Sequence, residues 1–283
     1  MSQAAYTLPN GETIHHRRKY ETEFLYREIF VNRVYLKHGI ELSPGARVID
    51  VGANIGLFSL FVKCEQPDAV VYGFEPAPEL CEIAKLNTQR FGASVQLFAL
   101  GLSDSNAVRE FTYYPDYSIM SGFHAVSERD RGVLEQGIRT QLRALSKSAQ
   151  SVNQKLVDAL IAKKLEGSTR YDCPMTTLSS FIAETKLSRV DLLKIDAERC
   201  ELEILRGVAE TDWPKLQQIV VEAHDPATRD ALASLLVARG YRIVVEQESQ
   251  FTDSQIFNLY AFSPRSSQDP SSQSPVDRDR SEP

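Results

Sequence analysis

The sequence lacks any long hydrophobic run. No apolar stretch in its 283 residues approaches the roughly 20 residues that a membrane-spanning helix needs. The first residues, Met1 to Gly11, also lack the basic start and apolar centre of a secretory signal. We therefore expect no membrane segment and a cytoplasmic protein.

Cysteine is scarce and scattered. The four cysteines show no C-x-x-C pairing, and most of them lie inside apolar periodic segments. In such places cysteine behaves as a small hydrophobic residue. Cys64, Cys81, Cys173 and Cys200 are accordingly expected to be reduced core or surface thiols.

Positive charge is also in deficit. The chain carries 32 Lys and Arg against 38 Asp and Glu, a net charge of −6. Phosphate binding needs clustered Lys and Arg, and the basic cluster from His15 to Lys19 is short. Nucleic acid is therefore a poor candidate for the substrate.

What the sequence does contain is an alternation of strand and helix patterns. From about Ala46 to Phe262, short β-branched runs alternate with segments whose apolar residues recur every three or four positions. This alternation is typical of βαβ units and a largely parallel sheet, so we expect a doubly wound α/β fold. The expected strands are Arg47–Val51, Val70–Phe74, Val95–Ala99, Asp191–Ile195, Gln218–Glu222, Arg242–Glu246 and Ile256–Phe262, the last two forming a hairpin-like end. The expected crossover helices are Leu57–Cys64, Pro78–Phe91 and Ala227–Arg239.

Three segments flank or interrupt this domain, which spans residues 46–263. Residues 1–45 are expected to form a helical segment, in which the aromatic residues of Tyr20–His38 pack on the core. An insertion at about 115–170 contains the helix-favouring Asp130–Lys164 and forms either a lid over ligands or a helical pair that extends the core. The tail, 264–283, is rich in Ser, Pro, Gln and Asp and is expected to be a disordered linker.

The strongest local signal is a glycine turn after the first strand, Val48-Ile-Asp-Val-Gly-Ala-Asn-Ile-Gly56. A dinucleotide-binding turn would read G-x-G-x-x-G, but Asn54 takes the place of its second glycine, which disfavours NAD. Gly52 and Gly56 let the backbone approach a ligand closely. Asp50, near the strand end, suits a cationic ligand such as the ammonium and sulfonium groups of S-adenosylmethionine.

The next two strands supply further candidate cofactor residues. Glu75, followed by Pro76, can accept hydrogen bonds from both hydroxyls of a ribose. The competing interpretation is a solvated carboxylate at a strand end. The third strand ends at Ala99 and Leu100, whose small and apolar groups could hold an adenine ring.

The fourth and fifth strands end in polar and acidic residues. Asp196 follows the fourth strand, and Glu222 and His224 lie two residues apart at the end of the fifth, where both face the same side if the chain stays extended. Such a cluster could accept a proton or bind a divalent metal ion, and either would serve methylation of a hydroxyl. The alternative is a histidine that only pairs locally. His124 is a second candidate base.

These motifs together resemble the FkbM family of methyltransferases. The resemblance rests on LPNG at Leu8–Gly11, FLYREIF at Phe24–Phe30, VIDVGANIGLFSLF, YGFEP, and LLKIDAERCELEILRG at Leu192–Gly207. The chain departs from the usual K-I-D-V-E-G-A-E of the family at Ala197, Arg199 and Cys200.

The resemblance implies a Rossmann-like methyltransferase sheet with strand order 3-2-1-4-5-7-6, in which the seventh strand is antiparallel. It also implies O-methylation in secondary metabolism, with a small or carrier-protein-bound hydroxyl substrate. Tyr117, Ser121 and His124 are expected to contact that substrate. The linker-like tail would suit a domain from a modular polyketide or nonribosomal peptide synthase. Two other classes remain: a non-catalytic methyltransferase-like binding domain and a nucleotide-dependent oxidoreductase.

Overall fold

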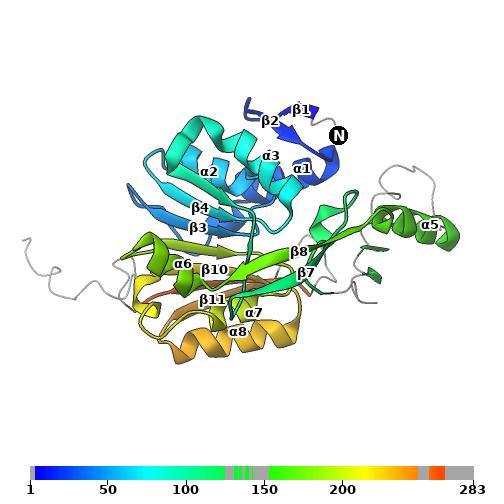
Figure 1. Cartoon of the computed structure of the whole chain (residues 1–283). Coiled ribbons are helices and arrows are strands. Elements are labelled where there is room, and N and C mark those ends of the chain that lie inside the picture. The colour runs from blue at the N-terminus through cyan, green and yellow to red at the C-terminus, as the bar shows by residue number, and fades with distance from the viewer. Residues whose placement is uncertain are drawn as a thin grey trace, which may run out of the picture.

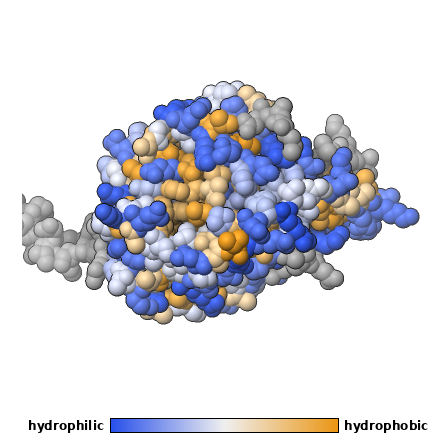
Figure 2. All heavy atoms as spheres, viewed as in Figure 1, coloured by the Kyte–Doolittle hydropathy of each residue, from blue (hydrophilic) through white to orange (hydrophobic). Residues whose placement is uncertain are grey.

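The computed structural model describes residues 4–124, 131–132, 134–135, 138–139, 142, 153–247 and 255–264. The expected linker beyond residue 264 and most of residues 130–152 of the insertion lie outside the described residues. The main sheet lies between two layers of helices (Figure 1), with α2 and α3 on one side and α6, α7 and α8 on the other. Figure 2 shows that this face is mostly hydrophilic, with hydrophobic residues gathered toward its middle.

The main sheet has seven strands, in the order β11-β12-β10-β9-β3-β4-β5. When the seven strands are numbered along the chain, this order is 6-7-5-4-1-2-3. It is the expected order, 3-2-1-4-5-7-6, read from the opposite edge of the sheet. The seventh strand, β12, is antiparallel to both of its neighbours, as expected. The strands are β3 (Arg47–Val51), β4 (Val70–Phe74), β5 (Val95–Phe98), β9 (Leu192–Ile195), β10 (Gln218–Ala223), β11 (Arg242–Gln247) and β12 (Phe257–Phe262).

Both faces of this sheet are buried. Val48 and Leu192 contribute to one hydrophobic cluster, while their neighbours Ile49 and Leu193 contribute to the other. Side chains along a strand alternate between faces, so a sheet that is covered on both sides needs continuous apolar strands. The runs of Val, Ile and Leu in the sequence meet that requirement.

Local sequence signals set the helix boundaries. Asp225 caps α8, where its side chain accepts a hydrogen bond from the Thr228 amide at 2.8 Å. α3 was expected to reach Phe91 but ends at Thr88, and a 3-10 turn, η3 (Gln89–Ser94), follows. The helices around the sheet are α2 (Leu57–Glu65), α3 (Pro78–Thr88), α6 (Leu178–Thr185), α7 (Glu201–Arg206) and α8 (Pro226–Ala238).

The N-terminal segment is only partly helical. It opens with an antiparallel hairpin instead, because the sequence Pro-Asn-Gly reverses the chain and Gly11 takes φ +88° there. The helix expected over Tyr20–His38 breaks into three pieces, with Arg33 in the left-handed region at φ 51°. The elements are β1 (Ala4–Thr7), β2 (Thr13–His16), α1 (Lys19–Tyr26), a π-helix η1 (Arg27–Val31) and a 3-10 turn η2 (Val34–Leu36). Of the aromatic residues expected to pack on the core, Tyr26, Phe30 and Tyr35 contact it, whereas Phe24 is not part of the core cluster and Tyr20 is exposed.

A second, three-stranded sheet went unpredicted. It comprises β6 (Gly101–Leu102), β7 (Ala107–Tyr113) and β8 (Thr169–Thr176), in the order β6-β8-β7. The insertion therefore leaves from the end of β7 and returns at the start of β8. Its described helix, α5 (Gln154–Leu165), lies away from the main sheet (Figure 1).

Within the described ranges, no helix is both long enough and apolar enough to span a membrane. Cys64 is exposed, and Cys81, Cys173 and Cys200 are buried free thiols.

Candidate active site

A cavity lies at the carboxyl ends of the central strands. It holds about 730 Å³ of space, part of which is open to solvent. Its walls include Gly52 after β3, Glu75 after β4, and Asp196 and Glu198 after β9. Ligands of doubly wound sheets bind beyond these strand ends, so the cavity stands where the cofactor was expected.

The glycine turn forms one wall of the cavity. Gly52 has φ +76°, and a Cβ at this position would lie 1.8 Å from the carbonyl oxygen of Asp196. The amides of Gly52 and Ala53 both donate to the carbonyl of Phe74 at 3.0 Å. The turn is thus fixed between β4 and β9 with no room for a side chain. Asn54 also lines the cavity, at φ 50°.

Gly56 has a different role from the one expected. It does not line the cavity, and a Cβ there would lie 3.2 Å from Ala84 in α3. It takes φ +82° at the start of α2. Its contribution is therefore the close approach of two helices.

Glu75 is a buried acceptor at the cavity wall. Its Oε2 accepts from the Asn54 amide at 2.8 Å and its Oε1 from the Ala77 amide at 2.9 Å. Burial raises its pKa to about 7, although these two hydrogen bonds oppose the shift. The carboxylate is therefore not a solvated strand end, and a free lone pair on each oxygen can still accept from a ribose hydroxyl. Pro76 lines the same wall.

Asp50 does not face the cavity, which corrects its expected contact with a cationic ligand. Its side chain is 0% exposed, with Oδ1 3.1 Å from Nζ of Lys194 and Oδ2 accepting from Ser59. Lys194 in turn donates to the carbonyls of Val51 (3.1 Å) and Gly52 (2.8 Å). Asp50 thus neutralises a lysine that holds the glycine turn from within the sheet.

Of the two residues expected to hold an adenine ring, one lies at the cavity. Leu100 lines the cavity together with Gly101 and Leu102. Ala99 is exposed and lies outside it, because the chain turns toward β6 directly after β5.

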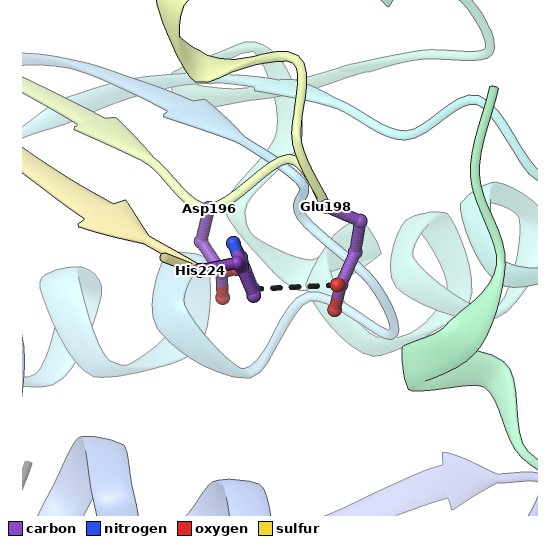
Figure 3. Close-up of side chains that lie close together, drawn as sticks. All are labelled: Asp196, Glu198 and His224. Atoms are coloured by element: carbon purple, nitrogen blue, oxygen red, sulfur yellow. Dashed lines mark ion pairs between the residues drawn. The ribbon is translucent and has the colours of Figure 1, made fainter. Parts of the chain in front are cut away.

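Polar residues at the ends of β9 and β10 lie close together, although Glu198, not the expected Glu222, forms one group with Asp196 and His224. Asp196 and His224 lie close to Glu198, and one ligand atom from each of the three lies within 4.8 Å of the others (Figure 3). Nε2 of His224 is 3.3 Å from both Glu198 Oε2 and Glu222 Oε1, and Nδ1 is 3.2 Å from Glu201 Oε1. Asp196 and Glu198 line the cavity, whereas Glu222 and His224 are not part of its wall.

Glu198 and Glu201 were missed by the sequence reasoning. The alternation of side chains along a strand does not predict where side chains point beyond the strand's end. Here the backbone of Glu198 and Arg199 lies in the left-handed region, at φ 46° and 79°. That turn is what returns Glu198 to the cluster. The acidic pair in Asp-Ala-Glu-Arg-Cys-Glu was the available signal, but its geometry depended on two unusual φ values.

The carboxylates change the acid–base state of the cluster. Burial lowers the pKa of His224, but the Glu198 and Glu201 carboxylates outweigh it and raise the pKa well above its ordinary value. The two acidic side chains therefore favour the protonated, imidazolium form of His224. Burial also raises the pKa of Glu198 to about 8, although His224 opposes the rise.

Of the three expected substrate residues, one lines the cavity. Ser121 does so, and its Oγ accepts from the Tyr114 amide at 3.0 Å. Tyr117 instead carries Nζ of Lys164 over its ring at 4.4 Å. His124 is exposed and lies 3.8 Å from the thiol of Cys200. The neighbouring apolar residues that do line the cavity are Leu25, Phe111, Ile119 and Phe123.

This fold and site define an S-adenosylmethionine-dependent methyltransferase: the strand order, the glycine turn after the first strand and the buried acidic residue after the second occur together. Residues 50–243 match the methyltransferase FkbM domain, and the chain belongs to this family.

Two relatives in other organisms are similar along most of the chain. The 31-O-demethyl-FK506 methyltransferase FkbM of Streptomyces tacrolimicus is 38% identical over 90% of this chain and 95% of its own length. The AMB antimetabolite synthetase AmbE of Pseudomonas aeruginosa is 36% identical over 91% of this chain, which covers 12% of that protein. A solved structure, precorrin-6y C5,15-methyltransferase from Geobacter metallireducens, is 15% identical with a TM-score of 0.43, over 83% of this chain and 88% of that one.

Proposed function

We propose that the protein is an O-methyltransferase that acts on a hydroxyl of a secondary-metabolite intermediate. The observation that carries this proposal is the cluster of Asp196, Glu198, Glu222 and His224 beside the cofactor cavity. An alcohol is a poor nucleophile until its proton leaves, so an O-methyltransferase needs a proton acceptor next to the methyl donor. A domain that only bound the cofactor would not need one.

The similar proteins support a natural-product acceptor. The Streptomyces relative is named for methylating 31-O-demethyl-FK506, which is O-methylation of a small molecule. The Pseudomonas relative is a synthetase much longer than this chain, which supports an acceptor held on a carrier protein. We propose a hydroxyl acceptor that is either free or tethered in this way.

Each part of the cavity has a task in this proposal. S-adenosylmethionine supplies a methyl group that is already activated by its sulfonium charge. Glu75 accepts hydrogen bonds from the ribose hydroxyls, and Gly52 allows the backbone to approach the cofactor. Leu25, Ile119 and Phe123 exclude water from the acceptor side. The chain must then align an in-line displacement and accept one proton.

Two routes can accept that proton. Glu198 lines the cavity and has a pKa of about 8, close to the operating pH that favours a general base; His224, protonated between carboxylates, stabilises its negative charge. Alternatively, the cluster holds a divalent cation that lowers the pKa of the bound hydroxyl. A chelator distinguishes the routes, because it abolishes turnover only in the second.

The proposal is tested by incubating the protein with methyl-labelled S-adenosylmethionine and a panel of free and carrier-linked hydroxy compounds, read by mass spectrometry. We expect label on oxygen. His224→Ala should lower turnover roughly 100-fold and leave the affinity for S-adenosylhomocysteine nearly unchanged. Glu203→Gln is the matched control, since Glu203 lies on α7 and pairs with Arg109 outside the cavity.

Label on nitrogen or carbon would contradict the proposal, as would wild-type turnover in His224→Ala. Tight cofactor binding without transfer to any member of the panel would favour the non-catalytic binding domain.

A further inference from the structure

We infer that Tyr35, from the N-terminal segment, orients Asp196 in a divalent-cation site whose ligands are Asp196, Glu198 and His224. This inference deepens the proposed function and rests on its second route. It revises the expected ligand set, in which Glu222 stood in place of Glu198, and it makes Tyr35 a positioning residue.

The spacing of the three side chains suits one shared cation. Their ligand atoms lie within 4.8 Å of one another. Two ligands that are each about 2.0–2.4 Å from a metal ion are at most about 4–5 Å apart. Two carboxylates and an imidazole form a mixed oxygen and nitrogen set, which suits Mn²⁺, Fe²⁺ or Zn²⁺. Because Asp196 and Glu198 line the cavity, an acceptor oxygen can approach the ion from that side.

Charge around the cluster also calls for a cation. Glu198, Glu201 and Glu222 all lie within 3.3 Å of the His224 ring nitrogens, and Asp196 is a fourth carboxylate. A single imidazole faces these four acidic side chains, an oxygen-rich surrounding of the kind that divalent cations favour. Lys194 is the nearby buried cation, and it is paired with Asp50.

Glu222 is not placed as a ligand. It lies outside the group whose ligand atoms are all within 4.8 Å of one another, and it is absent from the cavity wall. Glu201 contacts Nδ1 of His224 at 3.2 Å. Carboxylates behind a metal-bound histidine commonly fix its ring in this way.

Tyr35 fixes the carboxylate of Asp196. Its hydroxyl donates to Oδ2 of Asp196 at 3.0 Å, which leaves Oδ1 available to the cluster. The backbone of Asp196 is already held, because its amide donates to Val51 and its carbonyl abuts Gly52. With both ends held, the carboxylate keeps a single orientation.

Tyr35 is itself rigidly placed. The side chain is buried, with its ring edge-on to Phe58 at 5.1 Å. The preceding carbonyl, that of Val34, accepts from the Tyr260 hydroxyl at 2.8 Å, and Arg33 pairs with Glu65 through both guanidinium nitrogens. Tyr35 lies outside residues 50–243, which match the family domain. The N-terminal segment therefore completes the site as well as covering the core.

The inference is tested by titrating Mn²⁺ into the full chain with S-adenosylhomocysteine present, monitored by electron paramagnetic resonance. We expect one site in the wild type, loss of that site in Glu198→Gln, and roughly tenfold or greater weakening in Tyr35→Phe. Tyr241→Phe is the matched control: its hydroxyl is equally buried and donates to Trp213 and Leu216, far from the cluster. It should leave Mn²⁺ affinity within about twofold of the wild type.

Three outcomes overturn the inference: no Mn²⁺ binding by the wild type, unchanged binding in Glu198→Gln, or equal effects of Tyr35→Phe and Tyr241→Phe. If Tyr35→Phe does not fold, 3,5-difluorotyrosine at position 35 is the second variant, because it keeps the ring and the hydroxyl but donates a stronger hydrogen bond. An unchanged Mn²⁺ affinity in that variant overturns the inference. Methyl transfer to oxygen that survives chelation would leave the proposed function standing and this inference refuted. A wild type that binds Mn²⁺ but transfers no methyl group would refute the proposed function and leave the cation site standing.

Discussion

Asp50 and Lys194 form an ion pair inside the main sheet, with 3.1 Å between Oδ1 and Nζ and side chains 0% and 3% exposed. The two residues occupy paired positions on the adjacent strands β3 and β9. Lys194 also donates to the carbonyl of Gly52, so the pair links the interior of the sheet to the cofactor turn.

Removing only one partner of this ion pair should destabilise the folded protein strongly. Lys194→Met leaves the Asp50 carboxylate buried without its counter-ion and should lower the free energy of unfolding by about 3–5 kcal/mol. The double variant Asp50→Asn with Lys194→Met should recover part of that loss. Urea denaturation followed by circular dichroism measures both. Lys85→Met, which removes an exposed pair with Glu82, is the control and should change stability by less than about 1 kcal/mol.

Gly52→Ala should abolish cofactor binding. The added methyl would lie 1.8 Å from the carbonyl oxygen of Asp196, so the turn must move away from β9. Gly45→Ala imposes a similar backbone cost at φ +68°, with nothing within 4 Å of the new methyl. Calorimetry with S-adenosylhomocysteine should detect no binding for the first variant and near-normal binding for the second. Equal affinities would show that the turn does not contact the cofactor.

Cofactor affinity should depend on pH through Glu75. Its pKa of about 7 in the free protein means that the carboxylate, for which we propose contacts with the ribose hydroxyls, is depleted as the pH falls. S-adenosylhomocysteine should therefore bind roughly tenfold more weakly at pH 6 than at pH 8. Glu75→Gln should bind weakly at both values, and a pH dependence that persists in it would assign the titration to another group.

Glu75 should make the folded protein less stable as the pH rises, which is the opposite of its effect on cofactor affinity. Between pH 4.5 and about 7 the folded chain retains a proton that the unfolded chain has lost. The contribution of Glu75 to the free energy of unfolding therefore decreases as the pH rises through this window. Thermal unfolding of the ligand-free wild type and Glu75→Gln across the window measures the difference.

Glu21→Gln should loosen the acceptor side of the cavity. Glu21, on α1, accepts from the amide of Ser118 at 2.8 Å and from its hydroxyl at 2.7 Å, and Ser118 lines the cavity. Losing charge-assisted hydrogen bonds worth about 1.5–3 kcal/mol should raise KM for the acceptor about tenfold or more, with cofactor affinity unchanged. Glu23→Gln, an exposed change on the same helix, should leave both values unchanged; a parallel loss of cofactor affinity in Glu21→Gln would indicate general disruption.

The main sheet could be predicted because each of its strands carries its own local signal. The bounds of β3 and β4 were predicted to the residue, since a β-branched run ends in a glycine or acidic turn at each. The second sheet was missed for the opposite reason. Residues 107–113 of β7 pair with residues 169–175 of β8 across the whole insertion, and Pro174 within β8 argues against a strand. Pairing at that distance leaves no local pattern.

The candidate site could be predicted only where a residue's position along a strand determines the direction in which its side chain points. Asp196 and His224 lie in one group of possible metal ligands, and Glu222 contacts His224, because parallel strands end at one edge of the sheet. Glu198 reaches the cluster through left-handed backbone. Asp50 was misassigned because its partner, Lys194, lies 144 positions away in the chain.

The paired strands β7 and β8, which flank the insertion, also determine how freely its length and sequence can change. Tyr113, the last residue of β7, pairs directly with Thr169, the first of β8, so residues 114–168 leave and re-enter the fold at neighbouring points. A segment closed at its base tolerates changes of length at a small entropic cost. The strands that carry the candidate site lie elsewhere, in the main sheet. The protein is therefore suited to segment exchange: a graft between positions 113 and 169 replaces Ser118, Ile119, Ser121 and Phe123 of the cavity wall and leaves Gly52 and Glu75 on the opposite side of the insertion boundary unchanged.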